Sequence, residues 1–213
     1  MKNNQHQYNT KNLISYWNNY YITKNDILPN SDFAKFTLEH IKKEKTLIDI
    51  GCGDGRDTFF FSNKKIKSTG IDFSDMAIKN NQKLENKYLK FLHLDLNNIE
   101  HHKVVYDYAY CRFLFHAIDD ELENKLLDWL KANIQEKVFI ETRIQDDYLE
   151  VENQNHYRRY FQEKGFEQKL INKGFKVLFS QTSKNFSQYR KIYNVDDLKT
   201  DPLLLRMILS NKV

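Results

Sequence analysis

Residues 47–57 read LIDIGCGDGRD and place three glycines, Gly51, Gly53 and Gly55, at alternate positions behind a short apolar run. The pattern predicts a strand that enters a tight turn, followed by the start of a helix. Glycines let the backbone fold tightly and let a ligand approach it, because no Cβ stands in the way. The helix behind the turn would offer unpaired N–H groups to an anion or another hydrogen-bond acceptor. We therefore expect a ligand to bind at this turn.

Two acidic residues stand where further strands are expected to end. Asp72 closes the segment STGID (68–72), and Asp95 closes the segment FLHLD (91–95). Ligands of open α/β sheets bind at the carboxyl ends of the strands. An acid that ends the second strand, about 20 residues after the glycines, can accept hydrogen bonds from ribose hydroxyls. The sequence thus predicts a cofactor that contains a nucleoside.

The spacing of the glycines narrows the choice of cofactor. The dinucleotide fingerprint G-x-G-x-x-G is not matched, because Arg56 stands three residues after Gly53. A phosphate-binding P-loop is excluded as well, since no G-K-[ST] follows. The segment from Asp49 to Gly55 instead matches D-x-G-x-G-x-G.

Together with Asp72 and Asp95, this motif resembles that of the class I S-adenosylmethionine-dependent methyltransferases, over roughly residues 45–145. The resemblance implies S-adenosylmethionine as cofactor, no metal, and a glycine turn packed against the methionine part. It also implies that Asp72 holds the ribose hydroxyls, that Asp95 and the backbone beside it bind the adenine amino group, and that the region of Cys111 faces the methionine ammonium. The cofactor-binding residues implied in this way are Asp49, Gly51, Cys52, Gly53, Gly55, Arg56, Asp72, Phe73, Asp95, Leu96 and Cys111. The alternative is a Rossmann-like fold that binds no ligand.

Predicted strands and helices alternate along the first part of the chain. The predicted strands are 46–50, 68–72, 91–95, 104–110, 138–143, 175–181 and 203–209, and no clear helix separates the last two. The predicted helices are 13–28, 33–41, 58–63, 73–86, 119–133 and about 156–173. Such alternation favours a parallel sheet covered on both faces. We expect a single α/β domain over residues 1–213, with a Rossmann-like, seven-stranded, mostly parallel sheet and residues 1–40 as an N-terminal helical cap or lid.

The composition fits a globular intracellular protein. Of the 213 residues 40% are hydrophobic, and the formal net charge is only +4, with basic and acidic residues interleaved. There is no strongly basic stripe of the kind that binds nucleic acid, so a nucleic-acid partner is not favoured. Two cysteines suggest neither a disulfide framework nor a metal site. With no apolar run long enough for a membrane span and no secretory signal, we expect a cytoplasmic location.

Aromatic residues are concentrated near the N-terminus, in the segment YWNNYY (16–21). Tyr16 and Tyr20 form one i,i+4 pair on a helix, and Trp17 and Tyr21 form another. One interpretation is a helix that packs its aromatics on the core. The other is a lid whose aromatics, Tyr16 and Tyr20 among them, cover the bound ligands and exclude water.

Acceptor-binding residues are expected just after the fourth and fifth strands. His116 could act as a general base, could hydrogen-bond an acceptor hydroxyl, or could cap the helix that begins near Asp119. Arg112 could bind an anionic acceptor or pair with an acid such as Glu141. These two residues, His116 and Arg112, are the candidate catalytic residues.

Further basic residues could bind an anionic acceptor. Arg143 ends the fifth strand, where a structural pair with Glu141 is the default interpretation. His156, Arg158 and Arg159 form the densest basic cluster, suited to phosphate or carboxylate or to a solvated helix face.

The segments RFLFHAI, ETR, HYRR and DPLLLR resemble a subgroup of small bacterial methyltransferases similar to tellurite-resistance-type and cell-surface-carbohydrate enzymes. This resemblance implies a small-molecule or glycan-linked acceptor, such as one bearing phosphate or carboxylate. We expect methyl transfer to oxygen. The alternatives are a detoxifying methyltransferase for tellurite or other soft anions, an RNA methyltransferase, and a non-catalytic subunit that binds the cofactor. The sequence leaves the oligomeric state open.

Overall fold

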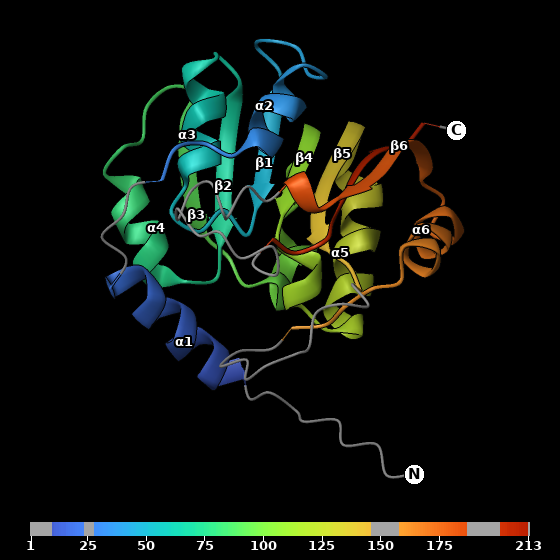
Figure 1. The fold of residues 1–213 in the computed structure, drawn as a ribbon. Helices are drawn as coiled ribbons and strands as arrows, with labels where there is room; N and C mark the ends of the chain where they lie inside the picture. Colours follow the sequence, from blue (N-terminus) through green and yellow to red (C-terminus); the bar gives the residue numbers. More distant parts are fainter. Residues whose placement is uncertain (1–9, 24–27, 146–157, 187–200, 213) are drawn as a thin grey trace.

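The computed structural model describes residues 10–23, 28–145, 158–186 and 201–212. Its centre is a seven-stranded sheet in the order β3-β2-β1-β4-β5-β7-β6 (Figure 1). The strands are β1 (Thr46–Ile50), β2 (Lys67–Asp72), β3 (Leu89–His93), β4 (Tyr106–Arg112), β5 (Ile134–Arg143), β6 (Lys176–Ser183) and β7 (Leu204–Ser210). Neighbouring strands from β3 to β5 are parallel, and β7 is antiparallel to both β5 and β6. The expected Rossmann-like, mostly parallel α/β sheet is confirmed.

Six helices accompany the sheet within the described ranges. They are α1 (Thr10–Thr23), α2 (Asp32–Leu38), α3 (Arg56–Asn63), α4 (Asp75–Gln82), α5 (Asp120–Asn133) and α6 (Glu163–Asn172). Short 3₁₀ segments cover 96–101, 115–117 and 184–186. Side-chain oxygens of Ser31, Ser74 and Asp119 accept a backbone N–H at the starts of α2, α4 and α5. These caps fix where the three helices begin, because they satisfy donors that a helix leaves unpaired.

Alternate side chains of the central strands pack against different helices. In β4, Tyr108 and Tyr110 are buried in the same cluster as Phe33 of α2, whereas Ala109 and Cys111 are buried in the cluster that contains the leucines of α5. Successive side chains of a strand point to opposite faces, so a fully buried strand needs a layer on each face. The helices on both faces follow from these continuous apolar strands.

The segment before α6 is not helical, although the sequence predicted a helix there. The predicted helix from about residue 156 begins only at Glu163, and the described residues 158–162 are not helical. Phe161 forms an isolated parallel bridge with Ile144, and the backbone N–H of Gln145 donates to the Phe161 carbonyl. The sequence-based prediction was wrong here because contacts with a distant strand override local helix propensity.

Helix α1 lies at the end of the sheet toward which β1, β2 and β3 run (Figure 1). It contacts α4, where the side chain of Asn18 hydrogen-bonds Ser74 and Asp75. The predicted helix 13–28 is thus realised as Thr10–Thr23, and residues 24–27 lie outside the described ranges. A cap function for residues 1–40 and a single domain over the whole chain remain predictions. No helix in the described ranges is long and apolar enough to cross a membrane.

Candidate cofactor and acceptor site

The glycine turn between β1 and α3 has a backbone that other residues would strain. Gly53 and Gly55 have φ of +54° and +72°, in the left-handed region that favours glycine. A Cβ on Gly53 would lie 2.3 Å from the hydroxyl of Tyr21, and one on Gly55 would lie 2.8 Å from the ring of Phe91. The turn is also tied to β2, because the N–H groups of Gly51 and Cys52 both donate to the Ile71 carbonyl. Both the backbone and the space above it therefore require glycine.

Asp72 joins this turn to the end of β2. Its Oδ2 accepts the N–H of Gly53 at 2.9 Å, and its Oδ1 accepts the N–H of Ser74 at 2.9 Å. Burial raises the pKa of this carboxyl, and the two backbone donors oppose the shift. Each oxygen still has acceptor capacity beyond one hydrogen bond, so Asp72 can accept hydroxyl groups as well.

Asp49 is the last but one residue of β1, just before the turn, and is 3% exposed. Its Oδ2 accepts the hydroxyl of Thr58 at 2.6 Å. Burial raises the pKa of the Asp49 carboxyl to about 8, and nearby Asp57 adds to the shift. A cation beside it would reverse the shift, because an opposite charge favours the ionised form. The carboxyl is therefore suited to a cationic ligand.

The two cysteines of the expected site are buried thiols. Burial raises the pKa of Cys52 and of Cys111 well above the usual value. Both side chains thus remain neutral and pack as small apolar groups. Beside Asp49 and Asp72, the two cysteines can contact a cofactor through their backbone and their neutral Sγ atoms. Neither thiol is set up to react as a thiolate.

The remaining expected cofactor residues lie at the ends of β1 to β3. Asp95 is half-buried and caps a 3₁₀ segment that starts at Leu96; its Oδ1 accepts the backbone N–H of Asn97. The Phe73 carbonyl accepts Nε2–H of His93 at 2.9 Å. Arg56 donates through Nη1 to the carbonyl of Pro29 at 3.2 Å and thereby holds the segment before α2.

These residues fit S-adenosylmethionine. The glycine turn has a left-handed backbone that lies close to Tyr21, and it is next to the carboxyl groups of Asp49 and Asp72. The cofactor is positively charged at its sulfur and ammonium and carries ribose hydroxyl donors, which match such carboxylates. Residue-by-residue assignments of the cofactor contacts remain predictions.

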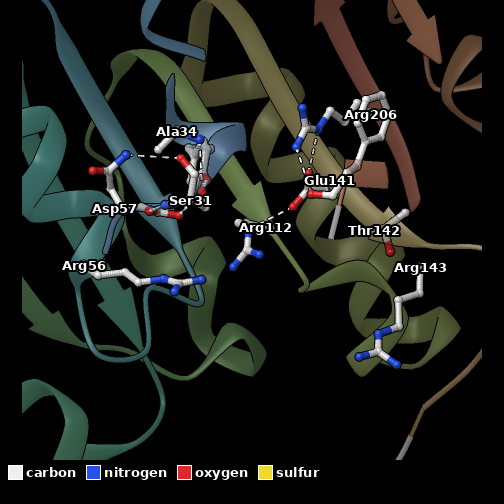
Figure 2. A network of polar contacts seen from close by, with 12 residues as sticks. Ser31, Ala34, Arg56, Asp57, Arg112, Glu141, Thr142, Arg143 and Arg206 are labelled. Carbon is white, nitrogen blue, oxygen red and sulfur yellow. Dashed lines mark hydrogen bonds and ion pairs between the residues drawn. The ribbon is translucent and has the colours of Figure 1, made fainter. Parts of the chain in front are cut away.

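A row of three charged residues crosses the sheet on the side where the acceptor is expected. Arg112 of β4, Glu141 of β5 and Arg206 of β7 are register partners. Arg112 Nε donates to Glu141 Oε1 at 2.9 Å, and Arg206 Nε donates to Glu141 Oε2 at 2.6 Å (Figure 2). The Arg206 guanidinium also stacks on Phe186 at 4.0 Å. The expected pairing of Arg112 with Glu141 is present, and Arg206 was missed because no local pattern connects it to Glu141.

His116 is buried against the opposite face of β5. Its Nδ1 accepts the backbone N–H of Arg143 at 3.3 Å and lies 3.2 Å from the hydroxyl of Thr142. Because Nδ1 is an acceptor in this arrangement, the proton of the neutral ring lies on Nε2. The expected alternative of a helix cap is not realised, since Asp119 itself caps α5.

Arg112 and Arg143 share an aromatic neighbour at the ends of β4 and β5. Their guanidinium carbons lie 4.1 Å and 5.8 Å from the centre of the Phe113 ring. Phe113 has φ of +58°, an uncommon value for a residue with a side chain. Figure 2 shows the guanidinium groups of Arg56, Arg112 and Arg143 on the same side of the strand ends.

Arg159 takes part in an ion cluster between α5 and α6. It pairs with Asp120 at 2.6 Å and with the buried Glu123, and Lys169 pairs with Glu123 at 2.5 Å. Its backbone N–H donates to the carbonyl of His116. The cluster gives Arg159 a structural task, holding the non-helical segment 158–162 against the loop after β4. Arg158 is half-buried in that segment, and His156 lies outside the described residues.

Two further features of the site were not predicted from the sequence. Asp57 accepts hydrogen bonds from the Ser31 hydroxyl and the Tyr110 hydroxyl, each at 2.7 Å, and ties α2 to the start of α3 (Figure 2). Tyr21 points at the glycine turn, and Tyr20 is 40% exposed. The acceptor-binding roles expected for Tyr16 and Tyr20 remain predictions. The stacked i,i+4 pair of Trp17 with Tyr21 was the available signal for the second feature.

Comparisons with known proteins agree with this geometry. A family model described as a methyltransferase domain matches residues 48–134. No curated protein matches the sequence. Among solved structures, 1,6-didemethyltoxoflavin-N1-methyltransferase of Burkholderia thailandensis, with its ligand and S-adenosylhomocysteine bound, is 16% identical with a TM-score of 0.73, over 94% of this chain and 88% of that one.

Two other solved structures share the fold. The [4+2]-cyclase SpnF is 11% identical with a TM-score of 0.69, over 94% of this chain and 93% of that one. A TehB-like methyltransferase of Corynebacterium glutamicum is 13% identical with a TM-score of 0.63, over 95% of this chain and 98% of that one. Likeness at this level of identity establishes the fold, and the matched family pattern covers the glycine turn and the ends of β1 to β4. Residues 48–134 therefore match a methyltransferase domain, and the chain has the fold of S-adenosylmethionine-dependent methyltransferases, which supports S-adenosylmethionine as its cofactor.

Proposed function

We propose that the protein transfers a methyl group from S-adenosylmethionine to an oxygen of a small-molecule or glycan-linked acceptor that bears a phosphate or carboxylate. The observation that carries the proposal is the pair of guanidinium groups, Arg112 and Arg143, that both lie near the ring of Phe113 at the ends of β4 and β5. Guanidinium groups bind phosphate and carboxylate in a bidentate manner, and flanking aromatic rings fix their planes.

The charge of the acceptor side favours an anion. In the row that crosses the sheet, two arginines share the single carboxylate of Glu141, so these three side chains together carry one positive charge. Arg143 adds a second charge nearby, and Arg56 reaches the same side of the strand ends (Figure 2). An anionic group on the acceptor would neutralise part of this charge in a partly desolvated place, where electrostatic attraction is stronger than in water.

The arrangement of His116 bears on the kind of oxygen that is methylated. The cofactor supplies a methyl group on a positively charged sulfur, which a nucleophile can attack directly. What the chain must then provide is alignment, which by itself can supply a large part of the acceleration. Since His116 Nδ1 already accepts the Arg143 N–H, the ring is prepared to donate from Nε2, and a base at Nδ1 is not set up. This favours an acceptor oxygen that is already ionised or loses its proton easily.

A soft anion such as tellurite is the second candidate, and the same observation at His116 supports it. A soft anion needs no proton removal and could bind to the same arginines. RNA is less favoured, because the net charge of the chain is only +4 and its charges are interleaved.

The test is to incubate the protein with methyl-labelled S-adenosylmethionine and a cell extract that has been separated into small molecules, glycans, RNA and protein. We expect label in the small-molecule or glycan fraction, in material that an anion exchanger retains. Label in RNA would contradict the proposal, and labelled volatile products after addition of tellurite would favour the second candidate.

A pair of variants tests the role of Arg143 once the labelled acceptor is isolated. Arg143→Gln should raise the KM for the acceptor by at least about tenfold, the scale of one lost charge-assisted hydrogen bond. The KM for S-adenosylmethionine should stay the same. Lys90→Gln removes one positive charge from an exposed position of β3 and serves as the matched control. Equal effects of the two substitutions would mean that Arg143 acts only through the overall charge.

A further inference from the structure

Tyr21 is placed directly above the glycine turn. Its hydroxyl would lie 2.3 Å from a Cβ on Gly53, so it occupies the space that this glycine leaves open. The ring stacks on Trp17 with centroids 6.2 Å apart and meets the edge of Tyr20 at 5.1 Å. These contacts along one helix hold the ring with its polar end toward the turn.

The position of α1 is fixed by Asn18. Its amide Nδ2 donates to Asp75 Oδ1 at 2.9 Å, and its Oδ1 accepts the Ser74 hydroxyl at 2.6 Å. Ser74 and Asp75 begin α4, two and three residues after Asp72. Residues three apart on a helix lie on the same side, so Asn18 anchors α1 at the place from which Tyr21 reaches the turn.

The Tyr21 hydroxyl is a donor without an acceptor in the described part of the chain. Within the described ranges the Tyr21 ring contacts Trp17 and Tyr20, and the hydroxyl makes no hydrogen bond to a described residue. Burial raises its pKa well above the usual value, and the nearby Asp72 and Asp54 add to the shift. The hydroxyl therefore stays protonated. A partly buried donor without a partner carries a desolvation penalty that a ligand acceptor would remove.

We propose that Tyr21 donates a hydrogen bond to a ribose oxygen of the cofactor, next to Asp72, which accepts from the ribose. A ribose hydroxyl both donates and accepts, so a neighbouring donor and acceptor match it. The methionine carboxylate is a poorer match, because Asp72 and Asp54 beside Tyr21 would repel it. The inference rests on the cofactor and on the expected role of Asp72, and it is independent of the acceptor proposed above.

The test compares Tyr21→Phe with Tyr20→Phe, which removes the hydroxyl of the exposed neighbour on the same helix. Affinities are measured by calorimetry for S-adenosylhomocysteine and for 5′-methylthioadenosine, which keeps the ribose and adenine but lacks the amino-acid part. Tyr21→Phe should weaken both ligands by the same factor, roughly 3- to 10-fold, the scale of one hydrogen bond. Tyr20→Phe should change neither. Unchanged binding by Tyr21→Phe, or a loss for S-adenosylhomocysteine alone, would overturn the inference.

A second comparison separates a direct contact from a general loosening of α1. Asn18→Ala should also weaken 5′-methylthioadenosine, because it frees the helix that carries Tyr21. If the anchor acts through Tyr21, the double variant loses less than the product of the two single losses. Losses that multiply would show that the two residues act independently and would contradict the positioning by Asn18. Neither assay requires an acceptor, so failure to find methyl transfer would leave this inference standing, and the reverse also holds.

Discussion

The raised pKa of Asp49 leads to a pH dependence of cofactor binding. In the ligand-free protein the carboxyl is buried at the end of β1, and its pKa is about 8, so at neutral pH it is mostly protonated. A cationic cofactor next to it favours the ionised form. Affinity should therefore increase as the pH rises toward 8, because less free energy is then spent on removing the proton.

The size of the effect follows from the pKa. If binding requires the ionised carboxyl, the apparent Kd is the Kd of the ionised protein multiplied by a factor. That factor is one plus the ratio of protonated to ionised protein. For a pKa of about 8, the Kd should fall roughly 25-fold from about pH 6 to about pH 7.5. The pH range of the comparison ends there because α-amino groups, such as that of the cofactor, lose their own proton near pH ~8. Calorimetry with S-adenosylhomocysteine measures this directly.

Asp49→Asn is the matched variant. It should bind the cofactor more weakly at pH 7.5, and its Kd should be nearly constant over the same range. Asp49 also affects the stability of the ligand-free protein. Because its folded-state pKa is raised, its stabilising contribution is full below the unfolded pKa near ~4 and is lost as the pH rises to about 8. The ligand-free variant should thus gain in Tm over the wild type between about pH 5 and pH 8. A wild-type Kd that does not change with pH would refute the assignment of Asp49 to a cationic ligand.

Three further changes test the framework of the site. Glu141→Gln leaves the buried Arg206 and the partly buried Arg112 without their shared carboxylate. It should lower the free energy of unfolding by about 3–5 kcal/mol in urea titrations, and a loss below about 1 kcal/mol would mean that the row is solvated. Tyr110→Phe removes one donor from Asp57 and should cost about 1–2 kcal/mol in the same assay, whereas no loss would show that another donor replaces it. Gly55→Ala forces a side chain into a left-handed backbone against the Phe91 ring; a loss of about 1–3 kcal/mol is expected from the strain, and an unchanged Tm would contradict the fit of the turn.

The cofactor side could be predicted from sequence because its signals are local. The glycine spacing, the acid at the end of β2 and the alternation of strands and helices each lie within short stretches. The family pattern at residues 48–134 and the observed sheet order confirm the fold and cofactor predicted from them. The strand ends moved by a few residues, as pairing with neighbours extends or shortens a strand.

The acceptor side depends on contacts between distant residues, which local patterns do not record. Arg159 was placed on a helix by its neighbours HYRR, but its ion pairs with Asp120 and Glu123 span 39 and 36 residues and hold it in a non-helical segment. Helical spacing gives two equivalent i,i+4 pairs, Tyr16 with Tyr20 and Trp17 with Tyr21, and does not indicate which pair faces the glycine turn. The rotation of α1 that decides between them depends on Asn18, whose partners lie 56 and 57 residues away.

The shared carboxylate of Glu141 also has a consequence for how the last strand finds its place. If β7 slipped by one residue against β5, Leu205 or Met207 would stand opposite Glu141, and Arg206 would turn toward the apolar cluster that α5 covers. A guanidinium buried there without a partner is strongly destabilising. The charged row thus acts against mispairing of an antiparallel strand whose other residues are nearly all apolar and would tolerate a shift. The correct pairing of the last strand is then favoured by the same charged row that we propose for binding the acceptor.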